Sequence, residues 1–424
     1  MPIETKSGNL YVKDADGHLI HLVPKITEFN EAVTVPAPSD TTDDSMQAAP
    51  VSWVRDELRF QIESASDGRN TIVRDDRGNP HVMVVIPRFR LEDVSSQYGS
   101  GTPPAFIVNG SYKKEILIGK YIASKGRDGR ACSAARAIPW TQIGFDNAVA
   151  ECRKLGSNFF MASNVLYTAR AMWLLKQRGD GVAYYGNTNY GRDVSRKWLT
   201  GTLTASYSPG DSGVGSTTYG AVTLTGTGGA DWNDDGTPYG IADLVGNVWE
   251  WCSGLRTVNG EIQVLADNSA MTASANFASD SSQWKAIASS TGNLVEPGTA
   301  NTLKYDSSVA DTSSIWSNIG TARLNTELEY PHSTGYSSGS FQSLTAANSL
   351  SIPLTLKSHG VMPLQSSGLQ GYYYVCNNGE FIAARGGTSA SAASGYSGPF
   401  SLNIVNARTN ASSKYIGFRL AYVV

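Results

Sequence analysis

The feature that most constrains the fold of this chain is a tryptophan-rich string near its middle. Residues 239–251 read YGIADLVGNVWEW, in which Trp249 and Trp251 flank Glu250 behind a Gly-Asn turn. This pattern predicts a strand that enters a hydrophobic core through two large aromatic side chains. The carboxylate between them must then be paired inside the protein or bound to a ligand, because a buried charge without a partner is costly.

Three shorter motifs follow in order: RGG at 385–387, AR at 407–408 and GFRLA at 417–421. Together with GNVWEW they resemble the formylglycine-generating-enzyme (sulfatase-modifying-factor) branch of the C-type lectin fold, over roughly residues 115–424. The resemblance implies an α+β domain with two helices and short, twisted antiparallel sheets. It also implies a fixed scaffold in which arginines hold the terminal loops by hydrogen bonds to carbonyls or carboxylates. The scaffold residues are Arg385, Arg408, Phe418, Arg419, Trp249 and Trp251.

The N-terminal part of the chain has a different character. Apolar residues alternate on both sides of an Asp-Gly turn over 8–20, which predicts a hairpin, and 71–86 reads as two strands around a turn. Residues 36–50 are rich in Pro, Ser, Thr and Asp and predict a linker. We therefore expect a small β-rich module for attachment or oligomerisation over 1–110, followed by a C-type-lectin-like ligand-binding domain over 111–424.

Within the larger domain, apolar residues recur every three or four positions over Thr141–Leu155 and again at about 163–178. This spacing predicts two amphipathic helices. From about 256 to 360 the chain is rich in Ser, Thr, Ala and Asn, which favours a loop-rich insertion over further core. The four cysteines contain no CxxC pair, so they are expected to be buried free thiols, with a disulfide as the alternative in an oxidising compartment.

Two observations argue against catalysis of the family type. The resembled oxidases need two cysteines between the GG and AR motifs, to hold copper and handle the substrate thiol. Residues 388–406 contain none, and the family positions fall near Ser391 and Tyr396; a hydroxyl cannot replace a thiolate ligand. The related sulfoxide-forming enzymes bind iron through several histidines, whereas the five histidines here have no metal-ligand spacing. We expect no enzyme, with a formylglycine-generating-type or iron-dependent sulfoxide-forming oxidoreductase as the alternative.

The last forty residues, 385–424, are similar to the variable region of proteins that diversity-generating retroelements mutate in phages and bacteria. The residue types reached by that process exclude Glu, Gln, Lys, Met and Trp, and within 388–415 only Lys414 lies outside the set. Exchangeable side chains belong on loops held by a rigid scaffold, and Tyr, Ser and Asn suit a ligand-binding surface. The expected contact positions are Ser389, Ser391, Tyr396, Ser397, Asn403, Val405, Thr409, Ala411, Ser412, Lys414 and Tyr415, with Tyr373 at the edge.

These resemblances imply a diversified receptor-binding protein of the phage-tail adhesin type, whose C-terminal face binds a cell-surface protein or glycan. The expected setting is a virion tail tip or a bacterial surface. A homo-oligomer is expected because several copies displayed together bind more strongly, and the resemblance to tail-fibre-like receptor binders implies a trimer. The alternative is a structural virion protein without a ligand. Net charge is −3 and no Lys/Arg block occurs, so a nucleic-acid partner is not expected.

No cofactor is required for such a function, but the resemblance implies a structural calcium site at the GNVWEW turn. Its ligands would be the carboxylates of Asp243 and Glu250 and the carbonyls of Gly246 and Val248; the alternative is that Glu250 pairs with a scaffold arginine. A second acidic string, Asp231–Gly236, opens like a calcium loop, but position twelve is Ala242, so an acidic turn is expected there.

The sequence also predicts how the protein is made. The N-terminus has no apolar signal segment, and no apolar stretch reaches the roughly 18 residues that cross a membrane. We therefore expect synthesis in the cytoplasm without a signal peptide, and no insertion into a membrane.

Overall fold

The computed structural model describes the backbone of strands β1 (Ile3–Lys6), β2 (Asn9–Lys13) and β3 (Leu19–His21), and then residues 56–204, 222–347, 350–363, 365–391, 393 and 395–424. The chain divides into two units, residues 1–57 and 58–424. In the first unit β2 pairs with both β1 and β3 in an antiparallel sheet, so the predicted hairpin is present. The predicted linker at 36–50 lies outside the described residues.

The second unit contains a five-stranded sheet in the order β11-β24-β8-β5-β4. Its strands are β4 (Asn70–Arg74), β5 (Pro80–Pro87), β8 (Glu115–Gly119), β11 (Phe159–Met161) and β24 (Leu420–Val423). The two strands predicted within 71–86 are therefore confirmed. They pair, however, through β8 with the C-terminal strand, so residues 58–110 belong to the larger unit. The division falls between Glu57 and Leu58, not near residue 110.

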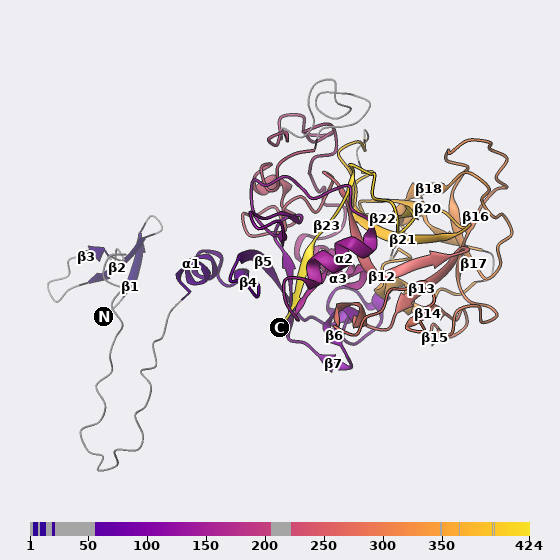
Figure 1. The fold of residues 1–424 in the computed structure, drawn as a ribbon, viewed down its shortest axis with the longest axis horizontal. Coiled ribbons are helices and arrows are strands. Elements are labelled where there is room, and N and C mark those ends of the chain that lie inside the picture. The colour runs from indigo at the N-terminus through magenta and orange to yellow at the C-terminus, as the bar shows by residue number, and fades with distance from the viewer. Residues whose placement is uncertain are drawn as a thin grey trace, which may run out of the picture. The chain divides into compact units, whose positions relative to one another are not determined.

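The larger sheet has twelve strands. It contains the WEW string and the start of the RGG motif, and its central strands are seen in Figure 1. At its centre lie β12 (Trp249–Val258), β21 (Glu380–Gly386) and β22 (Gly398–Asn406); β20 (Tyr372–Val375) and β18 (Ser337–Ser340) continue on one side, and β23 (Ile416–Phe418) pairs with the start of β12. Successive side chains of a strand point to opposite faces. Trp251 accordingly lies in one hydrophobic core and Cys252 in another.

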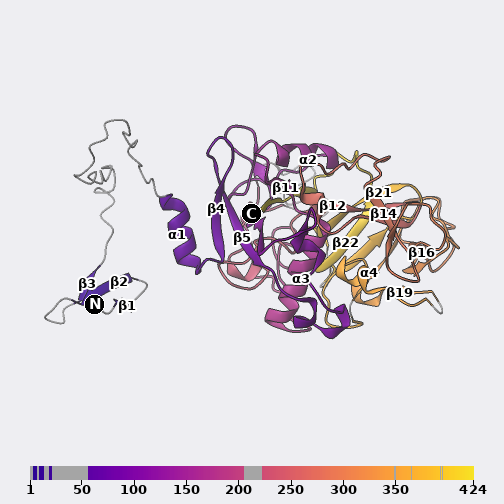
Figure 2. The same ribbon diagram turned by 90° about the horizontal axis from the view of Figure 1, so that it is seen from below.

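The two predicted helices are confirmed as α2 (Phe145–Arg153) and α3 (Asn164–Arg178). Phe145 of α2 packs in the core of Trp251, and Leu166 of α3 packs in the core of Cys252, so the helices cover opposite faces of the sheet (Figure 2). The Ser163 hydroxyl caps α3 by accepting from the Leu166 amide at 3.2 Å. The first amide of α2 donates to the Arg408 carbonyl at 2.9 Å, which ties this helix to the C-terminal loop.

The segment 256–360 is not an insertion of loops alone, which corrects the expectation from composition. Its strands extend the large sheet at both edges, and the segment buries Trp284, Tyr305 and Phe341 completely or nearly so. Most of these strands have two to five residues, too few for the period-two pattern to stand out among serines and threonines. They are β13 (Glu261–Leu265), β14 (Trp284–Ile287), β15 (Leu294–Val295), β16 (Lys304–Ser307), β17 (Ala322–Asn325), β18 and β19 (Thr345–Ala346), followed by α4 (Leu354–Ser358).

One α-helix and four short strands remain. They are α1 (Glu57–Ser66), β6 (Ile107–Val108), β7 (Ser111–Tyr112), β9 (Ser124–Lys125) and β10 (Ala131–Cys132). All four cysteines are free; Cys152, Cys252 and Cys376 are buried and Cys132 is partly exposed. Within the described part of the chain, none of the helices combines the length and the apolar character needed to cross a membrane.

Candidate ligand-binding face

The tryptophan-rich string and the last motif meet at a buried ion pair. Glu250 and Arg419 are both fully buried, and the guanidinium donates to the two carboxylate oxygens at 2.6 and 2.8 Å. The Tyr167 hydroxyl of α3 donates to the same carboxylate. Arg419 also donates to the carbonyls of Gly119, Lys120 and Ala242 at 2.9–3.0 Å. Because it is fully satisfied, the pair joins both sheets without leaving an unpaired charge.

Arg385 forms a second buried anchor, on the opposite side of β12 from the tryptophans. Its guanidinium donates to the Asn164 side-chain oxygen at 2.7 and 2.9 Å and to the Gly360 carbonyl at 2.8 Å. No carboxylate of the described residues pairs with it, and burial lowers its pKa. The arginine therefore fixes α3 and the end of the 256–360 segment against β21 by hydrogen bonds to neutral oxygens.

Arg408 is the third anchor, and it lies closer to the surface. It donates to Glu380 at 2.9 and 3.2 Å, to Asp146 at 2.9 Å and to the Phe277 carbonyl at 2.7 Å. These partners come from β21, α2 and the loop before β14. One side chain of the C-terminal loop thus holds three separate elements.

The two glycines of the RGG motif are required by local geometry. Gly386 and Gly387 have φ of 94° and 105°, and a Cβ on Gly387 would lie 2.0 Å from the Ser397 hydroxyl. The tight turn brings Ser397 to Ser391, whose hydroxyl oxygens are 2.6 Å apart. The resemblance placed the cysteine pair of the oxidases near Ser391 and Tyr396, and Tyr396 directly precedes Ser397 in this turn.

A row of aromatic side chains, which we call the aromatic face, lies beside this turn. Tyr372 and Tyr374 project from one side of β20 and are partly exposed, as are Tyr336 and Tyr396. Trp316 is 56% exposed. Ring centroids are 5.2 Å apart for Trp316 and Tyr336, 6.0 Å for Tyr336 and Tyr374, 5.5 Å for Tyr374 and Tyr372, and 4.3 Å for the stacked pair of Tyr372 and Tyr396.

Neighbouring residues of the large sheet support this row of rings from behind and on both sides of β20. The Trp249 ring meets Tyr374 at 5.9 Å, so the WEW string lies directly behind the aromatic face. Uncharged residues flank β20: Ser338 pairs with Tyr374 on one side and Asn403 on the other. Burial raises the pKa of Tyr374 and of Tyr372, so both hydroxyls stay protonated at neutral pH. The surface is therefore aromatic, neutral and able to donate hydrogen bonds.

Comparison with protein families gives a match to the sulfatase-modifying factor enzyme 1-like domain over residues 59–423. The chain belongs to this family. The family includes both formylglycine-generating enzymes and variable proteins of diversity-generating retroelements. The match begins at residue 59, next to the start of the second unit at Leu58. The mixed fold, with few helices and several sheets, is consistent with a C-type-lectin-like domain. A comparison with curated proteins finds no match.

The positions expected to contact a ligand fall into two groups, and four of them are buried. Ser389 and Ser397 lie under the RGG turn with 0% and 1% exposure. Tyr373 points to the opposite side of β20 from its neighbours, and its hydroxyl accepts from the Ala322 amide at 3.0 Å. Asn403 is 7% exposed, and its side-chain oxygen accepts from Val405 and Asn406. The expectation of exposure was wrong for these four residues.

The second group reaches the surface. Tyr396 belongs to the aromatic face. Thr409, Ala411 and Ser412 are exposed on the loop between β22 and β23. Ser391, Val405, Lys414 and Tyr415 are partly exposed.

The carboxylate predicted to bind calcium is used in another way. Both Glu250 oxygens accept from Arg419, which agrees with the alternative that Glu250 pairs with a scaffold arginine. Asp243 is buried and accepts from the Gly226 amide at 2.7 Å. In the acidic string at 231–236, Asp234 pairs with Arg170. Across the part of the chain that the structure describes, no group of three or more His, Cys, Asp and Glu side chains could hold a metal ion.

Sequence reasoning missed Trp316 and Tyr336. Both belong to the segment expected to contain only loops. Tyr336, directly before β18, reaches Tyr374 because β18 pairs with β20 in register, and Trp316 packs on Tyr336. The sequence held no clear signal for them, because single aromatic residues in a polar segment are common on protein surfaces.

Proposed function

We propose that the chain is a non-catalytic binding protein whose aromatic face contacts a cell-surface protein or glycan. The observation that carries the proposal is the row of five partly exposed rings from Trp316 to Tyr396. Large aromatic side chains dominate the energy of binding surfaces because they offer rigid area with few torsions to immobilise. Here the rings are held by one another and by a packed sheet, so little ordering is needed when a ligand binds.

The turn beside the face supports a binding role over a redox role. The resemblance places the cysteine pair of the family's enzymes near Ser391 and Tyr396, where this chain has two hydroxyl side chains. A hydroxyl pair does not bind copper as a thiolate does. We infer that this member of the family keeps the scaffold and has no oxidase chemistry.

The finer part of the proposal concerns diversification. The exposed residues Thr409, Ala411 and Ser412 belong to a loop that Arg408 anchors at its beginning and β23 at its end. Such a loop tolerates exchange, as the variable region of a retroelement-diversified protein requires. We place the protein on a phage tail tip or a bacterial surface, as a trimer in which several weak faces act together.

The test is binding of the full chain to a panel of bacterial cells and isolated surface glycans and proteins. Trp316→Ala and Tyr374→Ala should each weaken binding by about tenfold or more, as for central aromatic contacts. The matched controls are Trp198→Ala and Tyr112→Ala, since these side chains are 74% and 64% exposed outside the face. The controls should keep full affinity.

Three outcomes would overturn the proposal. Equal losses in the controls would show that the aromatic face is not the contact surface. Stoichiometric copper or iron with turnover of a thiol substrate would establish the oxidoreductase alternative. Failure to bind any cell, glycan or protein of the panel would favour a structural virion protein.

A further inference from the structure

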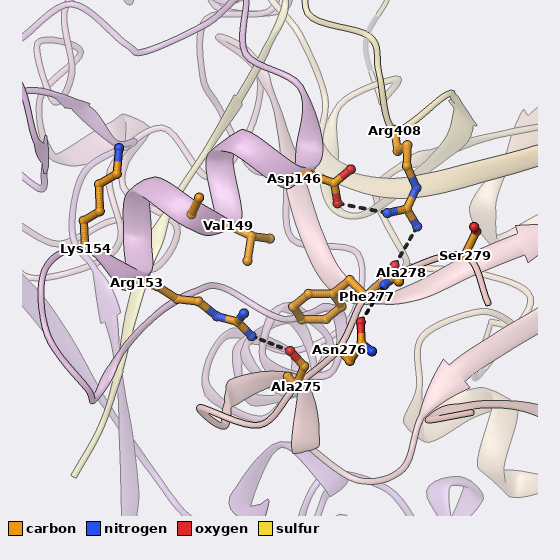
Figure 3. A pocket seen from close by; sticks show the side chains of 11 residues that line it. Asp146, Val149, Arg153, Lys154, Ala275, Asn276, Phe277, Ala278, Ser279 and Arg408 are labelled. Atoms are coloured by element: carbon orange, nitrogen blue, oxygen red, sulfur yellow. Dashed lines mark hydrogen bonds and ion pairs between the residues drawn. The ribbon is translucent and has the colours of Figure 1, made fainter. Parts of the chain in front are cut away.

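A groove separate from the aromatic face lies between α2 and the segment 275–279, with a volume of about 840 Å³ (Figure 3). The groove is broad and largely open to solvent. It shares no residue with the aromatic face. Of the residues that line it, only Arg408 lies in the last forty. The lining residues that matter here are Asp146, Val149, Arg153, Lys154, Phe277 and Arg408.

The groove has an apolar floor and a polar rim. Val149 and Phe277 are each 7% exposed, and their buried surfaces continue the core around Trp251. Lys154, Asn276 and Ser279 are exposed around the opening. A few polar groups around an apolar floor are typical of a site that orients a ring-shaped ligand.

The two arginines of the groove differ in how many hydrogen bonds their guanidinium groups donate to the protein. Arg408 donates to two carboxylates and a carbonyl, so its guanidinium is committed to the fold. Arg153 donates once, to the Ala275 carbonyl at 2.7 Å, and lies over the Phe277 ring at 5.5 Å. No carboxylate of the described residues pairs with Arg153. A guanidinium has five N–H donors, so most of those on Arg153 remain for a ligand.

The charges around Arg153 favour an anion at its end of the groove. Lys154 follows it directly, and although Lys154 pairs with Glu151, that pair is at the surface and contributes little. Asp146, the one acidic residue of the lining, is paired with Arg408 at the other end. Arg153 is partly buried, so its attraction for an anion is screened less by water and salt than at an exposed arginine.

We propose that this groove binds a ligand that carries a carboxylate on a ring with an apolar face, of the sugar-acid class. The carboxylate accepts from Arg153, for which arginine offers a two-pronged geometry, and the ring lies against Phe277. The rim residues Asn276 and Ser279 provide hydrogen bonds for ring hydroxyls. The site is independent of the aromatic face and lies mostly on residues outside the exchangeable loop.

Calorimetric titration of the full chain with glucuronate, and with glucose as the uncharged ring of the same size, tests the proposal. We expect glucuronate to bind at least tenfold more tightly than glucose, with an affinity that falls as salt is raised. Arg153→Gln should abolish this preference. Arg127→Gln is the control, because it removes an arginine that lies outside the groove.

Arg153 also holds the Ala275 carbonyl, so its removal could loosen the groove. Arg153→Lys separates the two roles, because it keeps the charge and one hydrogen bond but not the two-pronged geometry; it should lower glucuronate affinity several-fold with little change in melting temperature. Equal affinity for glucuronate and glucose, absence of glucuronate binding, or an unchanged preference in Arg153→Gln would each overturn the proposal. None of these results bears on binding at the aromatic face.

Discussion

The arginine frame (Arg385, Arg408 and Arg419) and the aromatic face are neighbours in the same domain, but their side chains are used in opposite ways. In the frame, each guanidinium donates to several protein oxygens, and two of the three are fully buried or nearly so. In the face, the side chains contact chiefly one another and keep part of their surface in water. The residues that stabilise the fold are therefore distinct from the residues proposed to bind a ligand, even where the two kinds alternate along one strand.

Strand β20 shows this alternation most clearly. Tyr373 is buried against the core of α3 and bonds to the Ala322 amide, whereas Tyr372 and Tyr374 belong to the aromatic face. Three identical residues in a row thus have two different roles, decided by the pleat alone. Changes on the inner side should therefore alter stability, and changes on the outer side should alter binding.

The largest effect is expected for Arg419→Ala. It leaves the buried Glu250 carboxylate without its partner, which costs about 3–5 kcal/mol of unfolding free energy. Denaturant titration of the purified variant measures the loss. The double variant Arg419→Met with Glu250→Leu should recover much of it, because no charge is then buried alone. If the single change costs less than about 1 kcal/mol, a surface-like value, the ion pair is not part of the frame.

The next effect concerns Lys120, whose carbonyl accepts from Arg419 and whose ammonium donates to the Gly240 carbonyl at 2.8 Å. Burial lowers the pKa of Lys120 to about 8. The folded chain therefore loses this proton before the unfolded chain does, and the group adds stability as pH rises. Between pH 8 and 10 the gain is about 2 kcal/mol.

Buried tyrosines and cysteines oppose this gain at high pH, because burial raises their pKa values. The measurement is therefore the difference between wild type and Lys120→Met in unfolding free energy at pH 8, 9 and 10. The wild type should gain relative to the variant over this range. Parallel pH profiles would contradict a lowered pKa at Lys120.

The sequence was enough to predict the frame, because its residues belong to strong local patterns. The two tryptophans around Glu250 indicated a buried strand. The spacing of apolar residues predicted α2 and α3 correctly. The aromatic face depends on which strands pair, and pairing of β18 with β20 joins residues far apart in the chain. Short strands such as β16 and β19 carry too few residues for a pattern, and burial of Ser389 follows from the RGG turn above it. These features need the assembled fold.

A smaller effect is expected from enlarging the buried serine at position 397. Ser397→Tyr places a ring where Gly387 and Ser391 already crowd the hydroxyl, so it should cost about 1–3 kcal/mol through overpacking. Thermal unfolding monitored by circular dichroism reports the change. A neutral result would show that the RGG turn can open and that this position is exchangeable after all.

The smallest effect on stability is expected for substitutions in the exposed loop between β22 and β23. These substitutions test the comparison between the arginine frame and the aromatic face most directly. Thr409→Tyr and Ser412→Tyr change residues that are exposed and outside the strands, so each should shift the unfolding free energy by no more than about 0.5 kcal/mol. Each should nevertheless change which surfaces in a binding panel the protein recognises, because a tyrosine adds rigid contact area to an exposed loop. Trp316→Ala in the same background should weaken every one of those interactions. If instead the loop variants lose stability while recognition stays the same, the loop belongs to the frame, and the replaceable surface is confined to the rings from Trp316 to Tyr396.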